Sequence, residues 1–115
     1  MKKTVKKTGD YGIGQMIHVV HMSEDAAAMT AFYEDVFGAV TYMGRDGPTF
    51  LEVEDRWATL VVISDLCIEP MAPNLPANPE LPVGKFYTRF GRHLHSIGYQ
   101  IDDLAGFGNH LIEKG

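Results

Sequence analysis

Residues 17–39 read IHVVHMSEDAAAMTAFYEDVFGA, and this stretch decides the fold. The apolar run over residues 16–22 alternates, which predicts a strand with His18 on one face and His21 on the other. The following Ser-Glu-Asp supplies capping residues for a helix whose apolar side chains recur at helical spacing. Gly38 is placed to end this helix. The predicted core side chains of the helix are Ala28, Met29, Phe32, Tyr33, Val36 and Phe37.

Three strands are predicted after this helix. The first begins at VTYM and resumes at TFLEV after the turn-rich GRDGP, the second is WATLVVI, and the third is LCIEPM. The almost wholly apolar WATLVVI, residues 57–63, is typical of a strand buried on both faces. A second strand followed by Asp and a helix occurs near the C-terminus, at SIGYQIDD, and repeats the pattern of HVVHMSED.

The composition excludes several classes of protein. The chain has 115 residues, 45% of them hydrophobic, with no apolar run near the length of a membrane span, so we expect one globular domain in the cytoplasm, with no membrane partner. Four of the ten basic residues lie at Lys2, Lys3, Lys6 and Lys7, and the remainder is acidic, which argues against a nucleic-acid partner. Cys67 is the only cysteine, so no internal disulfide forms.

Four features of the sequence occur together in one known superfamily. His18 lies seven residues before Asp25, FYEDVFGA closes the first helix, CIEP ends the third of the following strands, and HSIGYQIDDL opens the second unit. Over residues 16–115 the chain resembles the vicinal oxygen chelate superfamily of glyoxalases, bleomycin-resistance proteins and extradiol dioxygenases. The resemblance implies an α+β fold, in which a βαβββ module with a four-stranded mixed sheet is followed by a strand–helix remnant of a second module. The expected organisation is a flexible basic arm over 1–15, the module over 16–71, a proline-rich connector over 72–92 and the partial second module over 93–115.

The resemblance also implies a metal site. His18 matches the ligand from the first strand of the module, and Glu69 matches the glutamate near the end of its fourth strand. This donor set suits a divalent transition metal such as Fe, Mn, Ni, Co or Zn. In the second unit Ser96 stands where metal-binding members have an imidazole, and His95 is one place away on the opposite strand face. His95 is therefore the third candidate ligand, on condition that a β-bulge turns it inward.

Other polar side chains have simpler explanations. We expect His21 and His93 to be packing or surface residues, and Asp102 and Asp103 to be cap and first-turn residues of the last helix. There is no GxSxG motif for nucleophilic catalysis and no glycine loop for a phosphate, so no cofactor other than the metal is predicted. No catalytic acid or base is assigned.

The last three strands of a second module are absent from the sequence. Either the sequence is a fragment of a two-module protein, or it is a short variant that completes its cup with a second chain. Unpaired sheet edges favour the second chain, so we predict a homodimer, with exchange of the C-terminal strand and helix as one form of it. Two functions remain open: a glyoxalase- or dioxygenase-like metal enzyme acting on a small oxygen-rich substrate, and a metal-free module that binds a small ligand, as bleomycin-resistance proteins do. A third reading is an inactive, truncated variant.

Overall fold

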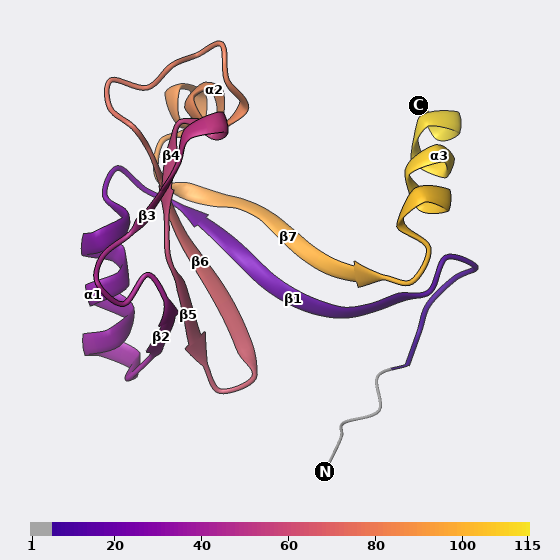
Figure 1. Cartoon of the computed structure of the whole chain (residues 1–115), viewed down its shortest axis with the longest axis horizontal. Coiled ribbons are helices and arrows are strands. Elements are labelled where there is room, and N and C mark those ends of the chain that lie inside the picture. Colours follow the sequence, from indigo (N-terminus) through magenta and orange to yellow (C-terminus); the bar gives the residue numbers. More distant parts are fainter. Residues whose placement is uncertain (1–5) are drawn as a thin grey trace. The chain divides into compact units, whose positions relative to one another are not determined.

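The computed structural model describes residues 6–115, so the predictions for Lys2 and Lys3 lie outside the described residues. In chain order, the elements are β1 (Ile13–Met22), α1 (Ala26–Phe37), β2 (Val40–Met43), β3 (Thr49–Leu51), a 3₁₀ turn (Glu52–Glu54), β4 (Arg56–Ala58), β5 (Leu60–Ile63), β6 (Leu66–Pro73), α2 (Pro82–Phe90), β7 (His93–Ile101) and α3 (Leu104–Lys114) (Figure 1). The first strand starts at Ile13, inside the segment predicted as a flexible arm. No helix among residues 6–115 is long and apolar enough to cross a membrane.

The strands form one mixed sheet in the order β2-β5-β6-β1-β7, with β3 paired to β4 and β4 to β6. β1 runs parallel to β6, whereas β4 and β5 run antiparallel to it. The α+β fold and the βαβββ order are therefore confirmed. The sheet has seven strands rather than four, because two predicted strands are each interrupted and because β7, predicted as part of the second module, joins the same sheet. The predicted strand 57–63 is broken at Thr59, whose amide donates to the Pro70 carbonyl oxygen at 3.0 Å.

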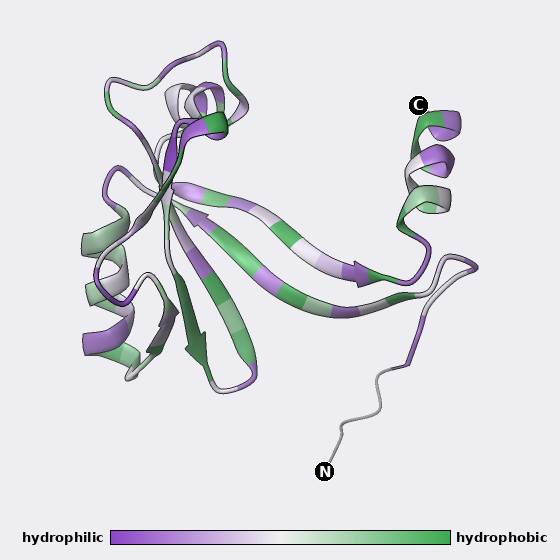
Figure 2. Ribbon diagram, in the orientation of Figure 1, coloured by the Kyte–Doolittle hydropathy of each residue, from purple (hydrophilic) through white to green (hydrophobic). Residues whose placement is uncertain are grey.

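The two faces of the sheet are covered by different helices. α1 lies against β5 and β6 (Figure 1). On this face of the sheet, Tyr33 of α1 contacts His21 of β1. On the other face Val20, Met22, Met71 and Val83 form a hydrophobic cluster, against which Phe86 and Tyr87 of α2 pack. Hydrophobic residues run along β5 and β6, while β1 alternates in hydropathy (Figure 2). The alternation of β1 therefore assigns His18 to the α2 face and His21 to the α1 face.

Local sequence signals set the ends of α1 as predicted, but its buried face differs. The Asp25 carboxylate accepts a hydrogen bond from the Ala28 amide at 3.0 Å, and Gly38 ends the helix in the left-handed conformation, with φ 66°. The buried side chains are Ala26, Met29 and Thr30. Phe32, Val36 and Phe37 are 51%, 59% and 56% exposed, so their prediction as core residues is wrong. Ala26, Met29 and Thr30 face the sheet, so Phe32, Val36 and Phe37 point toward the solvent.

A helix also forms within the segment predicted as a connector. α2 begins with Pro82 in its first turn, where a missing amide hydrogen costs nothing, and it buries Val83 and Gly84. A side chain at Gly84 would meet the backbone of Asn78, 2.7 Å from its carbonyl carbon. The proline-rich loop therefore passes directly against α2 and depends on a glycine there.

The chain divides into two compact units, residues 18–97 and residues 6–17 with 98–115. In the second of these units, the Tyr11 ring lies 5.7 Å from that of Phe107 and 5.1 Å from that of His110. Lys7 Nζ lies 2.8 Å from Asp102 Oδ1. Asp103 caps α3 by accepting from the Gly106 amide at 2.9 Å. All candidate site residues described below belong to the unit of residues 18–97.

Candidate functional site

The parallel pairing of β1 and β6 brings His18 and Glu69 together. In the register His18 lies opposite Cys67 and Val20 lies opposite Glu69. His18 and Glu69 therefore lie on the same face of the sheet, two residues apart along the paired strands. His18 Nε2 lies 3.2 Å from Glu69 Oε2. The Glu69 side chain is 12% exposed and the His18 side chain 29% exposed. The two residues matched to metal ligands thus meet across neighbouring strands, although 50 positions separate them in the sequence.

A residue that the sequence analysis did not single out, Arg56, holds the other oxygen of this carboxylate. Its Nη1 lies 2.6 Å from Glu69 Oε1, and its Nε lies 2.5 Å from Glu54 Oε2. Burial alone would lower the pKa of Arg56, but the hydrogen bonds to Glu69 and Glu54 outweigh it and raise that pKa. Arg56 is therefore a permanent cation next to His18 and Glu69. Only the register of β4 against β6 places Arg56 on this face, so no spacing in the sequence signals it.

His95 lines the same pocket, a cavity of about 200 Å³ that also contacts His18, Glu69 and Arg56. Its Nδ1 lies 2.9 Å from the Ser96 hydroxyl, and its ring packs edge-on against Phe86 at 4.6 Å. Burial, and then the charge of Arg56, lower the pKa of His95, so its imidazole is neutral at pH 7. All three predicted ligands therefore line one pocket.

The donor atoms fit part of a metal site. Two ligands about 2.0–2.2 Å from one ion and at right angles lie about 3 Å apart, close to the separation of His18 Nε2 and Glu69 Oε2. Catalytic metal sites usually take three protein ligands. Within residues 6–115, however, no three His, Cys, Asp or Glu side chains are close enough together to hold one ion. The described chain therefore offers two donors in position, with His95 nearby but not gathered to them.

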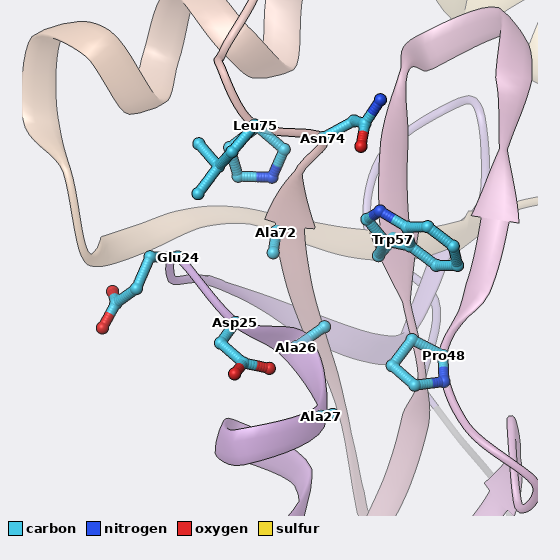
Figure 3. A pocket seen from close by; sticks show the side chains of 10 residues that line it. Glu24, Asp25, Ala26, Ala27, Pro48, Trp57, Ala72, Asn74 and Leu75 are labelled. Carbon is cyan, nitrogen blue, oxygen red and sulfur yellow. The ribbon is translucent and has the colours of Figure 1, made fainter.

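The histidines His21 and His93 do not line this pocket. His21 Nδ1 lies 2.8 Å from the Tyr33 hydroxyl on the α1 face, and His93 Nδ1 lies 2.8 Å from the Leu94 carbonyl oxygen. Trp57 lines a larger hollow of about 440 Å³, with Pro48 beside it and Asp25 across from it (Figure 3). Two polar side chains of that hollow are already engaged, since Asp25 caps α1 and Asn74 Nδ2 donates to Asp55 Oδ1 at 3.1 Å. We therefore place the candidate chemistry in the His18–Glu69 pocket.

Comparison of the fold with solved structures gives methylmalonyl-CoA epimerases. The enzyme from Mycobacterium tuberculosis is 17% identical, with a TM-score of 0.74 over 94% of this chain and 69% of that one. An epimerase in complex with methylmalonyl-CoA and NH4+ is 18% identical, with a TM-score of 0.73 over 90% of this chain and 72% of that one. A variant of the Streptomyces coelicolor epimerase, in complex with 2-nitronate-propionyl-CoA, is 19% identical, with a TM-score of 0.70 over 88% and 69%. No protein-family model matches the sequence, and no curated protein matches it. At these identities the likeness shows the fold alone.

Proposed function

Because the chain has the fold of the vicinal oxygen chelate superfamily, to which those epimerases belong, we propose that it is a metal-dependent enzyme acting on a small, oxygen-rich acyl substrate. The observation that carries the proposal is the 3.2 Å approach of His18 Nε2 to Glu69 Oε2 in a concave pocket. A divalent ion held there would act as a Lewis acid on two neighbouring oxygens of the substrate. The epimerase neighbours support a thioester as the substrate class.

We assign His18 and Glu69 as metal ligands and His95 as the third. A histidine binds a metal through its neutral imidazole, and the lowered pKa of His95 favours that form at neutral pH. Its Nδ1 already contacts the Ser96 hydroxyl, which leaves Nε2 for an ion. Partners of this kind on the second ring nitrogen are usual for metal-binding histidines.

Arg56 gives the pocket its own means of binding an anionic substrate. Its side chain is 15% exposed, and it reaches both Glu54 and Glu69. Its Nε and Nη1 donate to the two glutamates, so a substrate oxygen would be held by Nη2 through a charge-assisted hydrogen bond. In the proposed reaction Arg56 orients the acyl substrate while a base removes the proton from the carbon next to the carbonyl. The C–H electron pair moves into the carbonyl as an enolate, and a proton from the solvent then returns to that carbon. The residue that acts as this base is left unassigned.

We also propose that the enzyme is a homodimer. β2 and β7 lie at the two ends of the strand order, and β7 carries three exposed apolar side chains. These are Leu94, Ile97 and Tyr99, at 60%, 55% and 51% exposure. Exposed apolar edge strands favour pairing with another chain. Light scattering of the purified protein tests this, and a monomeric mass at micromolar concentration would reject it.

Hydrogen–deuterium exchange at the substrate tests the proposed activity. The metal-loaded protein is incubated with methylmalonyl-CoA in D2O, and deuterium at the carbon between the two carbonyl groups is followed by NMR. We expect exchange above that of buffer, and loss of the excess in Glu69→Gln. If the protein binds metal but the exchange does not exceed that of buffer, the proposal of a thioester substrate is rejected.

One observation favours a second function, the metal-free binding of a small anion. Glu69 already has a partner on each oxygen, Arg56 on Oε1 and His18 on Oε2, without any metal. In this alternative Arg56 replaces the ion as the positive charge of the pocket. Binding of a dicarboxylate such as malonate, unaffected by a chelator and lost in Arg56→Gln, would support this alternative over the enzyme.

A further inference from the structure

We propose that a second pocket, on the α1 face of the sheet, binds a small carboxylate with an apolar body. This pocket, called the His21 pocket below, has a volume of about 320 Å³ and lies within the unit of residues 18–97. It is lined by the end of β1, the loop of residues 23–25, one side of α1, and Arg92. Ligand pockets in proteins usually measure 300–1,000 Å³ and combine an apolar lining with a few polar groups.

The apolar wall of the His21 pocket comes from one side of α1. Ala28, Met29 and Phe32 line it from neighbouring positions of the helix. Met29 is 9% exposed and forms the inner part, while Phe32 is 51% exposed and extends the wall outward. An aromatic ring that the unit of residues 18–97 leaves half uncovered supplies apolar surface for the body of a ligand.

His21 supplies a polar side chain at this wall, held by a hydrogen bond to Tyr33. Burial, and then the charge of Arg92, lower the pKa of His21, while burial raises the pKa of Tyr33. At neutral pH the imidazole is therefore uncharged and the phenol keeps its proton. His21 Nδ1 and the Tyr33 hydroxyl oxygen lie 2.8 Å apart and share one hydrogen bond, so Nε2 is the ring nitrogen left to contact a ligand. The nearby Ser23 hydroxyl is engaged locally, donating to the Asp25 carbonyl oxygen at 3.1 Å.

Arg92 shows how the pocket holds a carboxylate. Its Nε lies 3.2 Å from Glu24 Oε2, and its Nη2 is bonded to Glu24 Oε1, so one edge of the guanidinium binds a carboxylate in bidentate fashion. The Arg92 and Glu24 side chains are 64% and 43% exposed. An exposed ion pair of this kind contributes little to stability, so a ligand carboxylate is able to replace Glu24 on Arg92 at small cost.

The charges around the His21 pocket are consistent with this exchange. Asp25 is engaged at the N-terminus of α1, where the Ala28 amide donates to it and the helix dipole offsets part of its charge. Glu24 and Arg92 neutralise each other in the free protein. When a ligand takes Arg92, Glu24 turns into the solvent, and the apolar body of the ligand covers Met29 and Phe32. Glu24 therefore competes with the ligand for the Arg92 guanidinium.

Three probes of one chain length test the chemistry of this site. Octanoate, 1-octanol and octylamine are titrated separately into the full-length protein, with binding measured by calorimetry and by ligand-detected NMR at pH 7.5. We expect saturable binding of octanoate at least tenfold tighter than that of the alcohol or the amine. Equal binding of all three, or no saturable binding of octanoate, would overturn the proposal.

Three substitutions locate the binding. Arg92→Gln removes the anion receptor, and we expect octanoate affinity to fall at least tenfold. Glu24→Gln removes the competitor, so affinity rises at least threefold. Arg89→Gln removes an exposed arginine of α2 that does not line the pocket, so affinity stays as in the wild type. The same loss in Arg89→Gln as in Arg92→Gln, or weaker binding in Glu24→Gln, would overturn the proposal. Circular dichroism of each variant checks that it is folded.

Discussion

Arg56 Nη1 lies 2.6 Å from Glu69 Oε1, so a guanidinium already holds one oxygen of the carboxylate that is expected to bind a metal. The other oxygen lies 3.2 Å from His18 Nε2. The arrangement orients Glu69 with Oε2 toward the imidazole, and it also places a positive charge close to any ion in the pocket. Arg56 therefore both organises the site and opposes the binding of a cation.

The first prediction compares these two effects in Arg56→Gln. A unit charge about 5 Å from a divalent ion costs on the order of 6 kcal/mol at an effective dielectric constant of about 20. Loss of a residue that orients a metal ligand lowers metal affinity about 10–100-fold, and this effect is smaller than the electrostatic cost of the Arg56 charge. We therefore expect Arg56→Gln to bind Co²⁺ or Zn²⁺ at least tenfold more tightly, as measured by competition with a chelating indicator.

Arg89→Gln is the matched control, because Arg89 is exposed on α2 and does not line this pocket. Its metal affinity should equal that of the wild type. Weaker metal binding by Arg56→Gln would mean that the orientation of Glu69 matters more than the charge of Arg56.

The second prediction concerns the pH dependence of stability. The pKa of His95 in the folded protein is below 6.5, the usual value, because burial and Arg56 disfavour its charged form. The unfolded chain therefore binds more protons than the folded chain as the pH falls through 6.5, so His95 lowers stability in that range. Urea unfolding in the presence of a chelator should show a smaller loss of stability from pH 7.5 to pH 5.5 in His95→Gln than in the wild type.

His93→Gln is the control for this experiment, since His93 is an exposed histidine on the same strand. Its pH dependence should stay closer to that of the wild type. If His95→Gln and the wild type lose the same stability on acidification, burial of His95 does not disfavour its charged form.

Much of the fold follows from local signals in the sequence, as Asp25 and Gly38 illustrate. Both act as the predicted caps of α1, because capping depends on a few consecutive residues. The buried face of α1 was mispredicted, because Met29 and Phe32 are equally apolar and only contact with β5 and β6 decides between them. Arg56 was missed for a related reason, since the register of β4 on β6, which the sequence does not show, brings it to Glu69.

The third prediction uses two glycines in helices. A Cβ at Gly84 in α2 would lie 2.7 Å from the Asn78 carbonyl carbon, whereas one at Gly108 in α3 meets nothing within 4 Å. Gly84→Ala should therefore destabilise the protein by at least about 2 kcal/mol, because backbone must move. Gly108→Ala should stabilise it by about 0.5–1 kcal/mol, since alanine favours helix. Chemical unfolding measures both, and equal stability of the two variants would show that α2 and the proline-rich loop are not packed as described.

The measurement that tests the central claim most directly is the metal content of the purified, reconstituted protein and of His18→Ala, by elemental analysis. The account predicts about one transition-metal ion per chain or per dimer in the wild type, and loss of that ion in His18→Ala with the fold retained. Equal metal content in the two proteins, or no metal in the wild type after reconstitution, would contradict it.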